Sequence, residues 1–209
     1  SIVIPETMVV LGSQYVEGTY TNILGTNLFQ GCTSLSSVTL PEGLDVLSNY
    51  MFEGCTSLKT IDLPESLTYL GTYTFQNSGL TSVTIPAGVK HLSLGKTSSA
   101  ASGTHNVYTF ANCTDLVSVT FNEGLETMGR FVFSGCTSLE SVKLPSSLYC
   151  MDRENFSDSG LKSITIPATL TDWDYSFINC TSLVTVTLER GITCLLYTSP
   201  SPRDMRRSR

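Results

Sequence analysis

Cysteine is the residue type whose spacing in this sequence first suggests chemistry. Five of the seven cysteines stand in one short motif, F-x-[GN]-C-T, at Cys32, Cys55, Cys113, Cys136 and Cys180. Paired cysteines form disulfides, and clustered thiolates bind metals such as zinc. However, no C-x-x-C pair occurs, and the cysteine spacing is that of a longer repeat. We therefore interpret the five residues as a structural ladder of small buried thiols that pack as apolar side chains.

The geometry of stacked repeats argues against disulfides within this ladder. Adjacent repeats could bring Cys32 and Cys55 to a Cα separation that a disulfide accepts, but in-register stacking points both Cβ atoms the same way. In two repeats the motif is replaced by "NSGL" at 77–80 and "DSGL" at 158–161. We expect the ladder to be interrupted at these two places.

The other groups that could do chemistry do not form a catalytic set. His91 and His105 have no serine, cysteine or carboxylate partner at a motif spacing, so we interpret both as solvated surface residues. Asp172 and Asp174 flank Trp173, as paired carboxylates beside a sugar-stacking ring would. The repeat register instead assigns Trp173 to the core and both acids to the surface. The sequence indicates no cofactor and no metal site.

The charge of the chain argues against a nucleic-acid partner. Residues 194–209 lack the repeat pattern and resemble translated sequencing-adaptor read-through, so we treat them as a non-native or disordered tail. The full chain has a net charge of -6, but without the four Arg and one Asp from Leu195 onward the net charge is -9. An acidic chain disfavours binding to phosphate backbones. No apolar run approaches the roughly 18 residues of a membrane span.

The cysteine motif belongs to a repeat that covers residues 1–193 as a single domain. An apolar residue followed by Pro, or by Asn or Glu in its place, recurs with spacings of 22, 23 or 36 residues, at Pro5, Pro41, Pro64, Pro86, Asn122, Pro145, Pro167 and Glu189. Units this small must stack on their neighbours, which indicates a solenoid of about eight rungs. Four of these positions recur 81 residues later, so a three-rung block is duplicated. Because Ser1 enters in mid-pattern, we expect a fragment.

Each rung contains one predicted strand and one return segment. In "LSSVTL", apolar Leu35, Val38 and Leu40 alternate with polar Ser37 and Thr39, as in a strand with one buried face. Equivalent strands are predicted near residues 1–4, 58–63, 80–85, 116–121, 139–144, 161–166 and 183–188. The proline after the strand turns the chain out of the sheet. The return segment is too short for more than one or two helical turns.

The residue before each motif cysteine is predicted to have a positive φ. Gly and Asn accept a left-handed backbone most readily, and they alone occupy this position, as Gly31, Gly54, Asn112, Gly135 and Asn179. The turn also explains the two N-C-T glycosylation sequons. Asn155 in "RENFSDSG" is therefore the more exposed candidate for glycosylation.

The repeat "F-x-G-C-T-S-L-x-x-V-x-L-P-x-x-L-x-x-L" resembles the BspA-like class of leucine-rich repeats over essentially residues 1–193. The resemblance implies a right-handed leucine-rich repeat solenoid, an α/β-class fold dominated by strands. Its parallel sheet is expected on the concave face, with short irregular or 3-10 segments on the convex side. It also implies a cell-surface or secreted protein that acts in adhesion by binding host, matrix or partner proteins.

Two sets of residues are candidates for partner binding. The outward strand positions form rows of Ser, Thr and charged side chains, among them Thr60, Asp62, Thr120 and Lys143. Such a face also serves simply to resist edge-to-edge association. Two extensions, 12–28 and 93–109, are expected to project as loops. Their candidate residues, of types found at recognition surfaces and in any exposed loop, are Tyr15, Tyr20, Asn22, Lys96, His105 and Tyr108.

These features favour a non-enzymatic interaction module that binds a protein or glycan through the extensions and the concave face. A purely structural repeat spacer is a second hypothesis. Binding of ice or a mineral surface by the Ser/Thr array is a third, although Asp62 and Lys143 interrupt the hydroxyl lattice. We expect no nucleic-acid partner and no membrane insertion.

Overall fold

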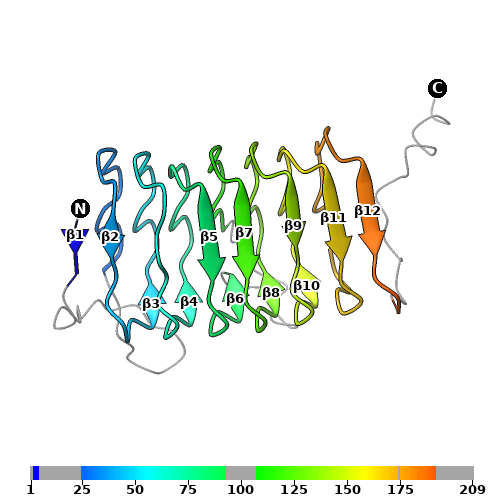
Figure 1. Ribbon diagram of the computed structural model, residues 1–209, viewed down its shortest axis with the longest axis horizontal. Helices are drawn as coiled ribbons and strands as arrows, with labels where there is room; N and C mark the ends of the chain where they lie inside the picture. The colour runs from blue at the N-terminus through cyan, green and yellow to red at the C-terminus, as the bar shows by residue number, and fades with distance from the viewer. Residues whose placement is uncertain (1, 5–24, 93–106, 174, 192–209) are drawn as a thin grey trace, which may run out of the picture.

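The computed structural model describes residues 2–4, 25–92, 107–173 and 175–191. Its strands form two rows along the long axis of the molecule, and the strands within each row point the same way (Figure 1). Every strand pairing is parallel. The described residues contain no helix. Parallel strands joined by whole turns of chain are the expected arrangement of a repeat that stacks on itself.

The first series of strands, here called the main strands, follows the predicted L-x-x-V-x-L positions. They are β1 (Ile2–Val3), β2 (Val38–Thr39), β5 (Ser82–Ile85), β7 (Ser118–Phe121), β9 (Ser141–Lys143), β11 (Ser163–Ile166) and β12 (Thr185–Leu188). They pair as β1–β2, β5–β7 and β9–β11–β12. The prediction of parallel main strands is confirmed at these positions.

The predicted strand at 58–63 is wrong, because the chain there has no regular strand pairing. Leu58 and Ile61 are nevertheless buried as the alternation requires. The outward residue of this rung is Asp62, whereas five of the other main strands carry Thr at that place and β9 carries Lys143. Asp is among the residues least favourable in strands. Pairing of the main strands is interrupted between β2 and β5, and also between β7 and β9, although the buried core is continuous.

The return segments contain a second parallel ladder instead of the irregular or 3-10 segments that we expected. Its strands are β3 (Val46–Leu47), β4 (Tyr69–Leu70), β6 (His91–Leu92), β8 (Thr127–Met128) and β10 (Cys150–Met151). They join in the order β3-β4-β6-β8-β10, below and behind the main strands in Figure 1. A stretch of two residues is too short to show an alternation, but stacking in register still lets its backbone pair with the next rung.

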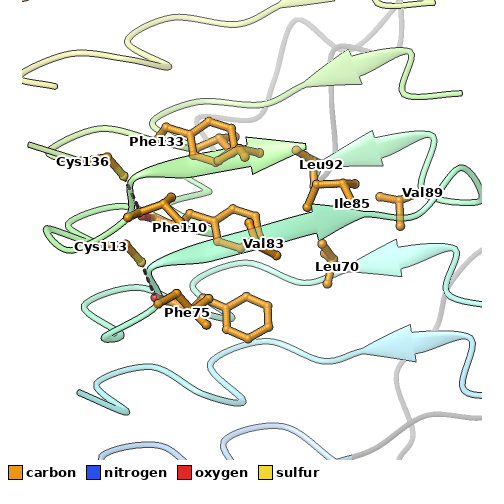
Figure 2. Close-up of a cluster of buried hydrophobic side chains, with 14 of the residues drawn as sticks. Leu70, Phe75, Val83, Ile85, Val89, Leu92, Phe110, Cys113, Phe133 and Cys136 are labelled. Atoms are coloured by element: carbon orange, nitrogen blue, oxygen red, sulfur yellow. Dashed lines mark hydrogen bonds between the residues drawn. The ribbon is translucent and has the colours of Figure 1, made fainter. Parts of the chain in front are cut away.

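The core lies between the two ladders and is built from columns of identical residue types. Seven phenylalanine rings stack in one column, with neighbouring centroids 5.3 to 5.8 Å apart: Phe29, Phe52, Phe75, Phe110, Phe133, Phe156 and Phe177. Leu70, Val83, Ile85 and Leu92 fill the space between the rings and the two ladders (Figure 2). Full burial of such a side chain contributes about 1.5 to 3 kcal/mol, so the core is the main source of stability.

The turn before each motif cysteine is left-handed, as predicted. The φ angles are 72°, 71° and 72° at Gly31, Gly54 and Gly135, and 57° at both Asn112 and Asn179. The corresponding residues of the two shorter rungs, Asn77 and Asp158, have φ angles of 57° and 56°. One turn geometry therefore serves the rungs with and without a cysteine.

The motif cysteines in the interior of the solenoid lie in a row of buried side chains. Cys55, Cys113 and Cys136 are buried free thiols, and each donates a hydrogen bond to the phenylalanine carbonyl of the preceding rung, at 3.1, 3.0 and 3.3 Å. Figure 2 shows two of these bonds, from Cys113 and Cys136. Burial raises the pKa of the Cys55 and Cys113 thiols to about 11. The thiols are therefore neutral donors at physiological pH and not reactive thiolates.

The predicted burial is wrong at the two ends of the described ladder, where Cys32 is exposed and Cys180 is only partly buried. The shorter rungs interrupt the row of thiols, and Ser78 and Ser159 take the place of cysteine there. Their hydroxyls lie 3.3 and 3.5 Å from the sulfur atoms of Cys113 and Cys180. The hydroxyl replaces the thiol because both are small hydrogen-bond donors.

The structure also corrects the interpretation of Asn155. We expected an exposed glycosylation candidate, but this side chain is fully buried and donates a hydrogen bond of 2.5 Å to the carbonyl of Asp152. Asn112 and Asn179 are the exposed sequon asparagines. Trp173 is partly buried against the core, with its ring 5.9 Å from that of Phe177. The tryptophan therefore packs against the core, as expected, but it is only partly buried.

Candidate binding surfaces

The main face is the exposed side of the main strands. All four of its predicted binding residues, Thr60, Asp62, Thr120 and Lys143, are exposed. Register aligns the polar side chains into columns: Thr84 pairs with Thr120, and Lys143 and Thr187 both pair with Thr165. The residues between them point into the core, as Val83, Val119 and Ile164 do. The main face thus presents aligned rows of hydroxyl groups, interrupted by Asp62 and Lys143, above buried core residues.

Ion pairs between rungs line the edge where the main strands begin. Lys59 Nζ lies 2.8 Å from Asp115 Oδ2, and Lys162 Nζ lies 2.5 Å from Glu140 Oε1. All four side chains are more than half exposed, so each pair adds at most about 1 kcal/mol to stability. These charges are consequently available to a ligand at little cost to the fold.

No group of three His, Cys, Asp or Glu side chains in the part of the chain that the structure describes could hold a metal ion. His91 is exposed, as predicted, and its Nδ1 lies 2.8 Å from the hydroxyl of Thr127. Within the described ranges, no helix is long and apolar enough to cross a membrane.

The candidates in the two extensions fall mostly outside the described residues, namely Tyr15, Tyr20, Asn22, Lys96 and His105. Tyr108 is described, and it belongs to the regular rung. The amides of Tyr73 and Phe75 donate to the carbonyls of Val107 and Thr109, at 2.8 Å each. Similarly, the amide of Asn27 donates to the carbonyl of Asn49 at 3.1 Å. The rung geometry thus resumes at residues 27 and 107, at the C-terminal ends of the two extensions.

Sequence reasoning missed a row of four stacked aromatic rings, Tyr50, Tyr73, Tyr108 and Phe131, here called the tyrosine strip. Successive ring centroids are 4.7, 5.2 and 4.7 Å apart, with interplanar angles of 6°, 29° and 11°. Each ring is partly exposed. The sequence contains the pattern that places these rings in one row. Each residue stands two positions before a core phenylalanine, in "YMF", "YTF", "YTF" and "FVF".

The backbone of the tyrosine strip is strained. The φ angles of Tyr50, Tyr73, Tyr108 and Phe131 are 59°, 60°, 46° and 61°, which is rare for bulky side chains. Such a backbone conformation destabilises the fold by on the order of 1 to 3 kcal/mol per residue. Each stacked aromatic pair stabilises it by about 0.5 to 1.5 kcal/mol. Asn27 occupies the same position in its rung with a φ of 61°. The aromatic residues are thus not required by the turn.

Parallel strands, repeated cores and inter-rung ladders together define a leucine-rich repeat solenoid. The chain belongs to the family described as BspA type leucine-rich repeat region, which matches residues 2–97 and 104–198 in six copies. No curated protein matches the sequence.

Solved structures of bacterial leucine-rich repeat proteins show the same fold. A protein from Bacteroides ovatus is 22% identical with a TM-score of 0.58, and the match covers 91% of this chain and 61% of that one. A leucine-rich repeat protein of T. pallidum is 24% identical with a TM-score of 0.53, over 90% of this chain and 69% of that one. This chain thus spans less than two thirds of the Bacteroides ovatus protein.

Proposed function

We propose that this chain is a non-enzymatic interaction module of a cell-surface or secreted protein, which binds a protein or glycan through its two extensions and the main face. Membership of the BspA type repeat family favours an interaction role. The observation that carries the proposal is the main face, where exposed Thr84 and Thr120 stand in register, as do Lys143 and the half-buried Thr165, above buried core residues. A rigid array of polar groups loses little conformational entropy on binding.

The extensions can be removed without cutting the rungs. Deleting residues 14–26 and replacing residues 93–106 with one glycine restores the spacing of the other rungs, while Asn27 and Val107 keep their places. Immobilised matrix proteins and glycans are then screened against the intact chain, and any ligand found is titrated against the deletion variant. We expect at least a tenfold loss of affinity with an unchanged melting temperature.

The contribution of the main face is tested separately with Thr120→Lys and Lys143→Glu. Both side chains are exposed, so the substitutions alter the face and leave the core intact. Thr114→Lys is a matched control, because this exposed threonine lies outside the main strands. If no ligand is bound, or if affinity survives both the deletion and the two substitutions, the proposed function is wrong and the spacer hypothesis is favoured.

A further inference from the structure

The tyrosine strip presents hydroxyl groups that make no hydrogen bond to another described residue. Phe131 stacks on Tyr108 at 4.7 Å, the same separation as between Tyr50 and Tyr73. The ring alone therefore suffices for stacking. Among the described residues, the hydroxyls of Tyr50, Tyr73 and Tyr108 have no hydrogen-bond partner. Three partly exposed donors thus lie in a row on the return segments, away from the main face.

The geometry of the strip restricts what it can bind. Stacking covers both faces of Tyr73 and Tyr108, so a sugar or an aromatic ligand cannot stack on these two rings. Only the edges and the hydroxyl groups of these rings are accessible. A ligand must therefore present a straight row of hydrogen-bond acceptors next to apolar atoms.

The spacing of the rings selects among extended peptides. Along a β-strand, carbonyls on one side recur every two residues, about 6.6 to 6.8 Å apart. In polyproline II, carbonyls on one side recur every three residues, about 9.3 Å apart, and they have no internal partners. Tyr50 and Tyr108 are separated by two ring steps of 4.7 and 5.2 Å. The distance covered by two ring steps matches the carbonyl spacing of one polyproline II turn. The distance of a single ring step matches neither the β-strand spacing nor the polyproline II spacing.

The charges beside the strip favour a basic ligand. Glu53 is close enough to Tyr73 to interact with it electrostatically. Glu154 takes the position after Phe131 in the same row, with a φ of 62°. The neighbouring cations are engaged, since Arg130 pairs with Asp152 at 3.3 Å and the Arg153 guanidinium lies over the ring of Tyr175 at 5.4 Å. An acidic border complements Lys or Arg side chains between prolines.

We propose that the tyrosine strip binds a basic, proline-rich segment of a partner protein in the polyproline II conformation. Tyr50 and Tyr108 donate hydrogen bonds to two carbonyls one turn apart, and Glu53 and Glu154 attract the basic side chains. Aromatic residues recognise polyproline II in this way because the ligand is already ordered before it binds. The inference rests on the proposed function only in that the chain binds a protein, and it concerns a different surface.

The test uses the whole chain and a fluorescent peptide of about twelve residues that repeats Arg-Pro-Pro, four turns of polyproline II. Binding is measured by fluorescence anisotropy. Tyr50→Phe and Tyr108→Phe keep the stack and remove one donor each, so each should weaken binding about three- to tenfold. Tyr73→Phe, half a turn out of register, should weaken it less than about twofold. Phe131→Tyr gives Tyr73 a partner one turn away and should strengthen binding.

Control variants and peptides separate this proposal from others. Tyr149→Phe removes an exposed tyrosine outside the strip and should leave the affinity unchanged. A peptide that repeats Glu-Pro-Pro, and a basic peptide with Gly and Ser in place of Pro, should bind at least tenfold more weakly. The deletion variant that lacks the extensions retains Tyr108 and should still bind the Arg-Pro-Pro peptide, so the two proposals can fail independently.

The proposal is wrong if the Arg-Pro-Pro peptide does not bind, or if it binds equally well after all three tyrosines are changed to phenylalanine. It is also wrong if the Gly-Ser peptide binds as tightly, because the attraction would then be charge alone. Loss of a self-association equilibrium in the triple variant, seen by analytical ultracentrifugation, would instead assign the strip to contacts between copies of the chain.

Discussion

At the scale of the residue, the motif cysteine is a hydrogen-bond donor of restricted size. Each buried thiol donates to the phenylalanine carbonyl of the preceding rung. That carbonyl also accepts a backbone amide, as Phe75 accepts from Ser78 at 3.0 Å. The thiol bond is thus a second bond to an acceptor that is already satisfied. Serine can replace cysteine here, whereas a larger side chain would have to displace the neighbouring rung.

This role predicts an order of stability among Cys113 variants. Cys113→Ala removes the donor and leaves a small cavity, so we expect a loss of about 1 to 2 kcal/mol in the free energy of unfolding. Cys113→Ser keeps a donor, as Ser78 does, and should cost less than half as much. Cys32→Ala is the control, because Cys32 is exposed. Urea unfolding measures the order, and equal losses for the serine and alanine variants would contradict the role of the hydrogen bond.

The buried thiols also predict how stability depends on pH. Burial raises the pKa of Cys55 and Cys113 from 9.0 to about 11. Folding therefore favours the neutral thiol, and this stability is fully present below pH 9 and is lost as the pH rises toward 11. The melting temperature should fall more steeply in that range for the native chain than for the double variant Cys55→Ser and Cys113→Ser. Parallel curves for the two proteins would show that the thiols do not couple to folding.

At the scale of the element, the shorter rungs depend on close contact between backbones. Gly79 and Gly160 follow the serines of the ladder, and a Cβ at either position would overlap the carbonyl oxygen of Thr56 or Thr137. Their amides donate to the carbonyls of Cys55 and Cys136 at 3.1 and 3.2 Å. Glycine thus allows a rung that is one residue shorter at this turn to keep its register.

Gly79→Ala should therefore destabilise the solenoid by about 2 kcal/mol or more, through a backbone shift that a flexible neighbour cannot absorb. Gly25→Ala is a matched control, because a Cβ at Gly25 meets no atom within 4 Å. The two variants are compared by thermal unfolding followed by circular dichroism. A loss at Gly79 no greater than that at Gly25 would mean that the rungs can separate freely at this point.

The main strands and the left-handed turns could be predicted because their physical cause lies in a few adjacent residues. Leu35, Val38 and Leu40 show the alternation directly, and Gly54 shows the turn. The second ladder could not be predicted, since Val46 and Leu47 are both buried and show no alternation. The missing strand at 58–63 was not predicted because the alternation was given more weight than the low strand propensity of Asp62. The burial of Asn155 depends on contacts between rungs. The tyrosine strip was visible in the sequence, but its importance depends on stacking that only the fold reveals.

At the scale of the whole molecule, the solenoid is a one-dimensional array. Contacts between strands join only neighbours within each ladder, such as β5 with β7 and β11 with β12. Strand β12 lies at the end of the described array, and its residues are exposed, with Leu188 at 42%. Ile85 in β5 holds the corresponding core position in the middle of the array and is fully buried. A side chain at the same position of the repeat therefore contributes a different amount to the free energy of unfolding in β5 and in β12.

This difference predicts that Ile85→Ala and Leu188→Ala will have unequal effects. Removing the Ile85 side chain leaves a cavity between two occupied rungs, which should cost about 2 to 5 kcal/mol. The Leu188 side chain is already partly solvated, and its rung can open without the others, so the loss should be less than about 1 kcal/mol. Hydrogen exchange by mass spectrometry should show faster exchange in β12 than in β5 and β7 before any substitution. Uniform exchange along the array, with equal losses in the two variants, would mean that the solenoid unfolds as one cooperative unit and that its ends are as stable as its centre.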